Sequence, residues 1–132
     1  MSSTAFPRIL IVDDEPANLR ILERYLDETR YRVTTAASGS EALSIIEARG
    51  PFDLYVLDVM MPGMRGTELT DAIRARHRGA RVLYFTGYSD DLFSGTRLLG
   101  ENEAFIQKPV TRREVLEAIS LMLFNDVKGP RG

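Results

Sequence analysis

A chain of 132 residues with a formal net charge of −2 has the size of one domain that can bury a core without covalent crosslinks. It has no cysteine, which excludes disulfides, thiolate nucleophiles and cysteine-based metal sites. It also has no basic footprint for nucleic acid, no apolar run long enough for a bilayer, and no opening signal-peptide pattern. We therefore expect a cytoplasmic protein that binds neither nucleic acid directly nor a membrane.

Apolar or β-branched runs alternate with segments of helical periodicity along the chain. The runs predict strands at about residues 8–12, 31–36, 54–57, 82–85 and 104–107. Helical spacing of apolar side chains follows the first, second, third and fifth of these strands. Residues 89–99 are a weaker helix candidate, because Ser94 and Gly95 interrupt them. We expect one domain over residues 1–124 and a polar tail over residues 125–132.

Residues typical of helix N-termini precede three of these helices. Asp14 is the predicted N-cap of the first helix. Ser38 with Glu41, and Thr111 with Glu114, have the spacing of a capping box. Strands that alternate with helices imply a parallel sheet with helices on both faces. Right-handed crossovers require the strand order to reverse somewhere, but the pattern leaves open where it does.

Four of the predicted strands end in polar residues that can handle a phosphoryl group. These residues are Asp13 and Asp14 after the first strand, Asp58 after the third, Thr86 after the fourth and Lys108 after the fifth. In an open parallel sheet, sites form outside the carboxyl ends of the strands. Lys108 is one of two lysines among 17 basic residues, so a compact ammonium at this strand end, in a chain that mostly uses arginine, indicates a function rather than chance placement. The pattern predicts one site rather than scattered polar residues.

Taken together, these residues resemble the receiver domain of two-component response regulators. Residues 58–66 (Asp-Val-Met-Met-Pro-Gly-Met-Arg-Gly) are similar to the family's phosphoacceptor aspartate, Met-Pro pair and two glycines. The resemblance covers about residues 7–124. It implies a flavodoxin-like, doubly wound, five-stranded parallel sheet of order 2-1-3-4-5 with helices on both faces.

The resemblance also implies a chemistry for the acids. Asp58 would accept a phosphoryl group from a phosphohistidine on a histidine kinase or a histidine phosphotransfer protein. Mg²⁺ would be held by Asp13, Asp14, Asp58 and the backbone carbonyl of Met60. Physical chemistry supports this reading, since clustered carboxylates repel one another without a cation and hard oxygen ligands suit Mg²⁺.

The remaining strand-end residues receive roles from the same resemblance. Lys108 would neutralise charge on the transferring group, and the Thr86 hydroxyl would donate to one of its oxygens. Phe105 would be the switch aromatic, turning inward when Thr86 is drawn to the phosphoryl group. The Lys108–Pro109 bond would be cis.

Two other classes of protein stay open. A metal-dependent phosphatase of the haloacid dehalogenase group needs a second aspartate two positions after its nucleophile, whereas Asp13 and Asp14 are adjacent. A pseudo-receiver that no longer takes phosphate is disfavoured by the complete set of acids with Thr86 and Lys108.

No output domain fits in the chain, which predicts a stand-alone regulator or a receiver excised from a hybrid kinase. We expect it to catalyse only its own phosphorylation and dephosphorylation, to act on a downstream protein that the sequence does not identify, and to have the option of forming a homodimer.

Several side chains near these motifs are assigned no chemistry. Glu15 and Asn18 are common in the first turns of helices, and His77 is interpreted as part of a solvated helix end. Phe105 is interpreted first as a core aromatic, whether or not it also switches. Loop packing is the expected role of the methionine side chains Met60, Met61 and Met64.

Overall fold

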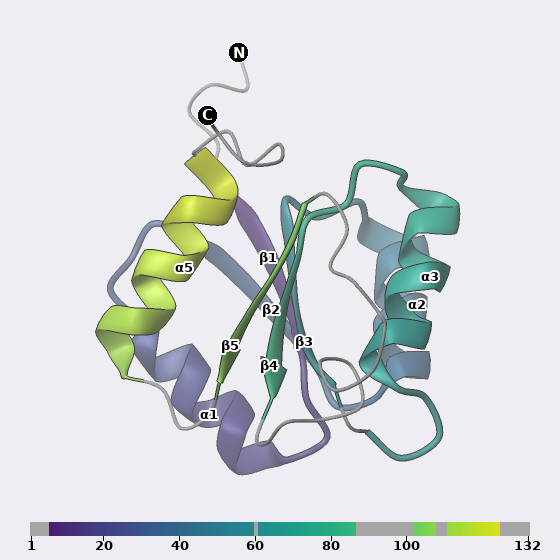
Figure 1. Cartoon of the computed structure of the whole chain (residues 1–132), viewed down its shortest axis with the longest axis horizontal. Coiled ribbons are helices and arrows are strands. Elements are labelled where there is room, and N and C mark those ends of the chain that lie inside the picture. The colour runs from purple at the N-terminus through teal and green to yellow at the C-terminus, as the bar shows by residue number, and fades with distance from the viewer. Residues whose placement is uncertain (1–5, 60, 87–101, 108–110, 125–132) are drawn as a thin grey trace.

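The computed structural model of the chain describes residues 6–59, 61–86, 102–107 and 111–124. Strands and helices alternate over residues 8–86, as the sequence predicts (Figure 1). The strands are β1 (Arg8–Val12), β2 (Arg32–Ala36), β3 (Leu54–Asp58), β4 (Val82–Thr86) and β5 (Glu103–Gln107). The helices are α1 (Pro16–Tyr25), α2 (Gly39–Arg49), α3 (Gly66–Arg76) and α5 (Arg112–Phe124).

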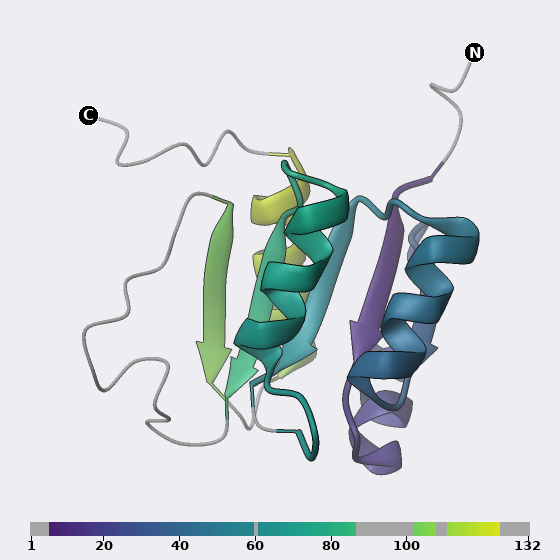
Figure 2. The same ribbon diagram turned by 90° about the vertical axis from the view of Figure 1, so that its right-hand side faces the viewer.

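The strands form one parallel sheet of order β2-β1-β3-β4-β5. This is the flavodoxin-like order, and it confirms the predicted fold class. The order reverses at β1, which pairs with both β2 and β3. Because all strands are parallel, their carboxyl ends lie along one edge of the sheet, where the arrowheads gather in Figure 2. The end of β1 lies beside the end of β3 at this edge.

Each face of the sheet carries its own apolar core, because successive side chains of a strand point to opposite faces. Leu10, Val12 and Leu57 belong to the core under α2 and α3. Ile9 and Ile11 belong to the core under α1 and α5. Figure 1 shows the sheet between these two helix pairs. Burial on both faces explains why the strands read as continuous apolar runs rather than as alternating patterns.

The capping boxes form with one difference from the prediction. The Thr111 backbone N–H donates to Glu114 Oε1 (2.9 Å) and the Glu114 N–H donates to Thr111 Oγ1 (3.1 Å), which completes that box. The Glu41 N–H donates to Ser38 Oγ (3.1 Å), as expected. The Glu41 carboxylate, however, accepts from the Ala37 N–H (2.8 Å), one residue before the predicted donor.

The prediction that Asp14 caps α1 is wrong. Pro16 occupies the start of the helix, so the N-cap is Glu15, which makes no side-chain capping bond. The Glu15 N–H donates instead to Asp13 Oδ1 (2.9 Å). The exposed carboxylate of Asp14 is therefore not committed to the helix end.

Two predicted segments lie outside the described residues. They are the helix candidate at 89–99 and the tail at 125–132, so the boundary between domain and tail stays a prediction. Across the ranges that are described, no helix combines the length and apolar character needed to cross a membrane.

Candidate functional site

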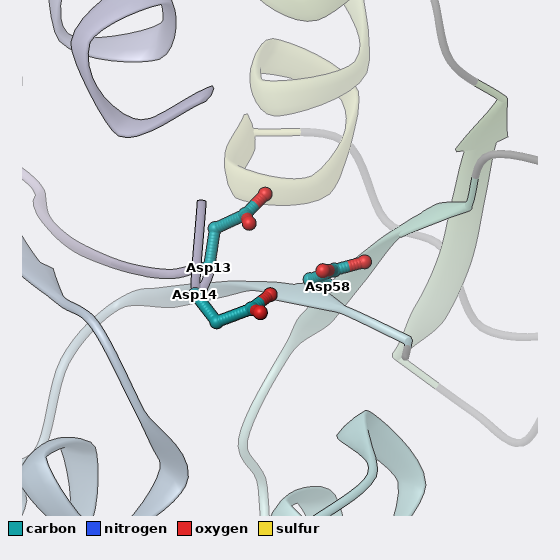
Figure 3. A group of neighbouring side chains, drawn as sticks. All are labelled: Asp13, Asp14 and Asp58. Atoms are coloured by element: carbon teal, nitrogen blue, oxygen red, sulfur yellow. The ribbon is translucent and has the colours of Figure 1, made fainter. Parts of the chain in front are cut away.

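Three carboxylates converge at the carboxyl edge of the sheet. Asp13 and Asp14 follow β1, and Asp58 is the last residue of β3. One oxygen from each lies within 4.8 Å of the others. Figure 3 shows the side chains reaching into the same space from these two strand ends. The adjacency that the sequence left open thus holds, since β1 and β3 are neighbours.

The three acids differ in their exposure to solvent. Asp13 is 2% exposed and Asp58 is 9% exposed, whereas Asp14 is open to solvent. Like charges this close repel one another, and two of the three have little water to screen them. The site is therefore set up to attract a cation.

The Asp13 carboxylate is held by two donors that the sequence analysis did not assign. Its Oδ1 accepts from the Glu15 N–H (2.9 Å), and its Oδ2 accepts from Asn18 Nδ2 (3.1 Å). Its own backbone N–H donates to the Ala36 carbonyl of β2 (3.1 Å). The only sequence signal was an amide in the first turn of the helix, where its side chain can reach back to the preceding loop. Asn18 therefore orients a site carboxylate.

The backbone after Asp58 is fixed on both sides. The Val59 N–H donates to the Phe85 carbonyl of β4 (3.1 Å), so pairing continues past the end of β3. The Gly66 N–H then donates to the Val59 carbonyl (2.8 Å) and closes the loop that follows. A Cβ on Gly66 would lie 2.5 Å from the Asp58 carbonyl oxygen. Only glycine permits this approach.

Side chains of the same loop pack inward. Met61 is 7% exposed and belongs to the core under α2 and α3. Met64 packs against that core, and its sulfur would lie 2.6 Å from a Cβ on Gly39. The expected packing role is confirmed for these two methionines. Met60, the predicted carbonyl ligand, lies outside the described residues.

The β4 and β5 side of the site is described in part. Thr86 ends β4, in register with Gln107 at the end of β5, but its side chain is not described. Lys108 and Pro109, with the predicted cis bond, lie outside the described residues. Phe105 is 47% exposed, so the interpretation of its ring as a core aromatic is wrong. β5 is the last strand of the described sheet, and its core contacts come from Ala104 and Ile106 instead.

His77 lies at the C-terminal end of α3, as expected, but it is only partly exposed to solvent. It is the C-cap of α3, and its ring packs edge-on against Tyr55 at 6.3 Å. Its Nδ1 is buried and has no hydrogen-bond partner among the residues that the structure describes. The 11 residues of α3 put this end about 16 Å from the start of the helix beside Asp58. His77 is therefore not part of the carboxylate site.

The three carboxylates fit a magnesium ion. Mg²⁺ binds oxygen at 2.0–2.1 Å in an octahedron, so ligands on opposite sides of it are about 4 Å apart. The oxygens of Asp13, Asp14 and Asp58 span no more than 4.8 Å. Small rotations would bring them to one ion, and the exposed Asp14 has the freedom to make them. All-oxygen ligands exclude a site built for a soft metal.

The fold and this acidic edge indicate a receiver domain, and known proteins that resemble the chain belong to the same class. The response regulator receiver domain family matches residues 9–120, and the chain belongs to this family. The transcriptional regulatory protein AfsQ1 of Streptomyces coelicolor is 37% identical over 112 residues. The sensor kinase CckA of Brucella abortus is 34% identical over 116 residues. The response regulator TrrA of Thermotoga maritima, solved in complex with Mg²⁺–BeF, has a TM-score of 0.74 and 33% identity.

Similar domains occur in two kinds of larger protein. The match covers 85% of this chain and 48% of AfsQ1, and 87% of this chain and 12% of CckA. The match with TrrA covers 89% of this chain and 100% of the other. The chain is therefore a receiver domain of two-component systems, homologous to those of response regulators and of sensor kinases.

Proposed function

We propose that this receiver domain accepts a phosphoryl group on Asp58 from a phosphohistidine, in a reaction that depends on Mg²⁺. The observation that carries the proposal is the convergence of three carboxylates within 4.8 Å at the carboxyl edge of the sheet. Among them, Asp13 is fixed by two donors, which suits a ligand rather than a nucleophile. Asp58 ends the central strand, between β1 and β4.

Asp13, Asp14 and Asp58 would hold the ion, with the Met60 carbonyl added by resemblance. When bound, Mg²⁺ would neutralise charge on the carboxylates and on the phosphoryl oxygens. The complex of TrrA with Mg²⁺–BeF supports this choice of ion, because that protein shares 33% of its residues with this chain.

In the proposed step, an Asp58 carboxylate oxygen attacks phosphorus as the P–N bond to the donor imidazole breaks. The electron pair of that bond stays on the imidazole nitrogen, and an acyl phosphate forms on Asp58. Little other chemistry is needed, so positioning and charge stabilisation dominate. By resemblance, Lys108 and the Thr86 hydroxyl would contact the phosphoryl oxygens.

The output would pass through Thr86 and Phe105. The exposed ring of Phe105 supports this role, because a ring that is 47% exposed has an inward position to gain. The phosphodonor would be a histidine kinase or a phosphotransfer protein. The phosphorylated domain would then bind a downstream protein or a second copy of the chain. Beyond its own phosphorylation and dephosphorylation, we propose no enzymatic activity.

The experiment is phosphorylation by a small acyl phosphate, followed by intact-protein mass spectrometry with Mg²⁺ or with a chelator. We expect one phosphoryl group, only with Mg²⁺ present, and none in Asp58→Asn. The matched control is Asp53→Asn, since Asp53 precedes β3 at the opposite edge and accepts the Arg8 N–H (2.7 Å). Equal labelling of Asp58→Asn and the wild type would overturn the assignment.

A further inference from the structure

A buried chain of hydrogen bonds joins β4 to the first turn of α3. Thr70 is 1% exposed and Tyr84 is 0% exposed. The Thr70 hydroxyl donates to the Gly66 carbonyl (3.0 Å) and lies 2.7 Å from the Tyr84 hydroxyl oxygen. Figure 2 shows α3 lying over β3 and β4.

The donors in this chain can be assigned. A threonine hydroxyl has one proton and accepts through its lone pairs. Because Thr70 gives its proton to the Gly66 carbonyl, Tyr84 is the donor in the 2.7 Å contact. The bonds therefore run in one direction, from Tyr84 through Thr70 to Gly66.

Gly66 carries this connection to the carboxylate site. Its N–H donates to the Val59 carbonyl (2.8 Å), and its Cα packs so closely on Asp58 that a Cβ would lie 2.5 Å from the Asp58 carbonyl oxygen. Tyr84 pairs in register with Leu57, directly before Asp58. The two hydroxyls thus tie together both ends of the 58–66 segment, which holds the phosphoacceptor.

We propose that Tyr84 and Thr70 are positioning residues for the carboxylate site. They would touch neither the ion nor the phosphoryl group. They fix the distance between β4 and the start of α3. This distance in turn fixes the position of the Asp58 backbone. The inference rests on the proposed function, because it assigns to the hydrogen bonds of Tyr84 and Thr70 a role in binding Mg²⁺ and the phosphoryl group.

A purely structural hydrogen bond and a positioning device predict different behaviour in a double variant. Replacing both partners of a buried bond by apolar groups of the same shape is often nearly neutral for stability. A structural role therefore predicts that function recovers together with stability in Thr70→Val/Tyr84→Phe. A positioning role predicts that stability recovers and binding does not, because the tie between β4 and α3 is still missing.

The experiment measures the urea midpoint, the affinity for Mg²⁺ by calorimetry, and the affinity of the Mg²⁺-loaded protein for beryllofluoride, an analogue of the phosphoryl group. We compare wild type, Tyr84→Phe, Thr70→Val, the double variant, and Thr70→Ser, which keeps the hydroxyl. The matched control is Tyr55→Phe, because Tyr55 is also a buried tyrosine, and its oxygen accepts the Phe52 N–H (2.9 Å) away from the site.

We expect the midpoint to be lowest in Thr70→Val and to recover in the double variant. Beryllofluoride affinity should fall about threefold to tenfold in both hydroxyl deletions and in the double variant, the range that one hydrogen bond supplies. Thr70→Ser and Tyr55→Phe should bind like the wild type.

Wild-type binding that persists unchanged in the double variant would overturn the positioning role alone. A wild type that binds neither Mg²⁺ nor beryllofluoride would overturn the proposed function, and this inference with it.

Discussion

Gly66→Ala should disturb the site through the backbone alone. The new Cβ would meet the Asp58 carbonyl oxygen at 2.5 Å and the Val59 Cα at 3.1 Å, and both contacts are backbone atoms that no rotamer change can move. Ordinary contact begins at 3.4 Å, so the chain must open by about 0.9 Å. Overpacking of this kind costs about 1–3 kcal/mol. A displacement near 1 Å can reduce a reaction rate by up to about 100-fold.

The assay combines urea unfolding with the rate of phosphorylation by a small acyl phosphate. Gly79→Ala is the control, because a Cβ at that position would have no atom within 4 Å among the described residues beyond its chain neighbours. We expect Gly79→Ala to change stability by less than about 0.5 kcal/mol and to leave the rate unchanged. If Gly66→Ala matched Gly79→Ala in both measurements, the contact between Gly66 and Asp58 would not constrain the site.

Three further predictions follow from particular contacts. Asn18→Leu removes the amide donor to Asp13, and calorimetry should show Mg²⁺ affinity lower by about tenfold, as for other residues that orient metal ligands. The Glu103 side chain is 2% exposed and pairs with Arg74 at 2.6 Å. Glu103→Ala removes this ion pair, and urea unfolding should show a free energy of unfolding lower by about 1–3 kcal/mol. Burial raises the pKa of Tyr55 above 10.0, so the unfolded chain ionises first and stability should fall as the pH rises past 10; in Tyr55→Phe the fall should be smaller.

Matched variants test each reason. Glu47→Ala breaks the exposed pair with Arg76 and should cost less than about 1 kcal/mol; an equal loss in Glu103→Ala would contradict the burial argument. Burial also raises the pKa of Tyr31, which keeps part of the alkaline slope in Tyr55→Phe, whereas an identical slope in that variant and the wild type would contradict the prediction. Wild-type Mg²⁺ affinity in Asn18→Leu would contradict the orienting role of the Asn18 amide.

The strand-end acids could be predicted because apolar runs end abruptly at charged residues, and the fold brings strand ends together. Their adjacency could not be derived from the pattern, since right-handed crossovers allow more than one strand order. Asn18 gave too little signal to assign a role, because an amide in the first turn of a helix can also face solvent. Phe105 was misjudged as a core residue because an apolar run does not reveal that its strand lies at the edge of the sheet.

The central claim is that Asp58 itself carries the phosphoryl group. Borohydride reduces an aspartyl phosphate to homoserine and leaves free carboxylates intact, so peptide mass spectrometry after phosphorylation and reduction identifies the modified residue directly. We expect homoserine at position 58, only in samples phosphorylated with Mg²⁺ present. Homoserine at position 13 or 14, or equal conversion of position 58 in the presence of a chelator, would contradict it.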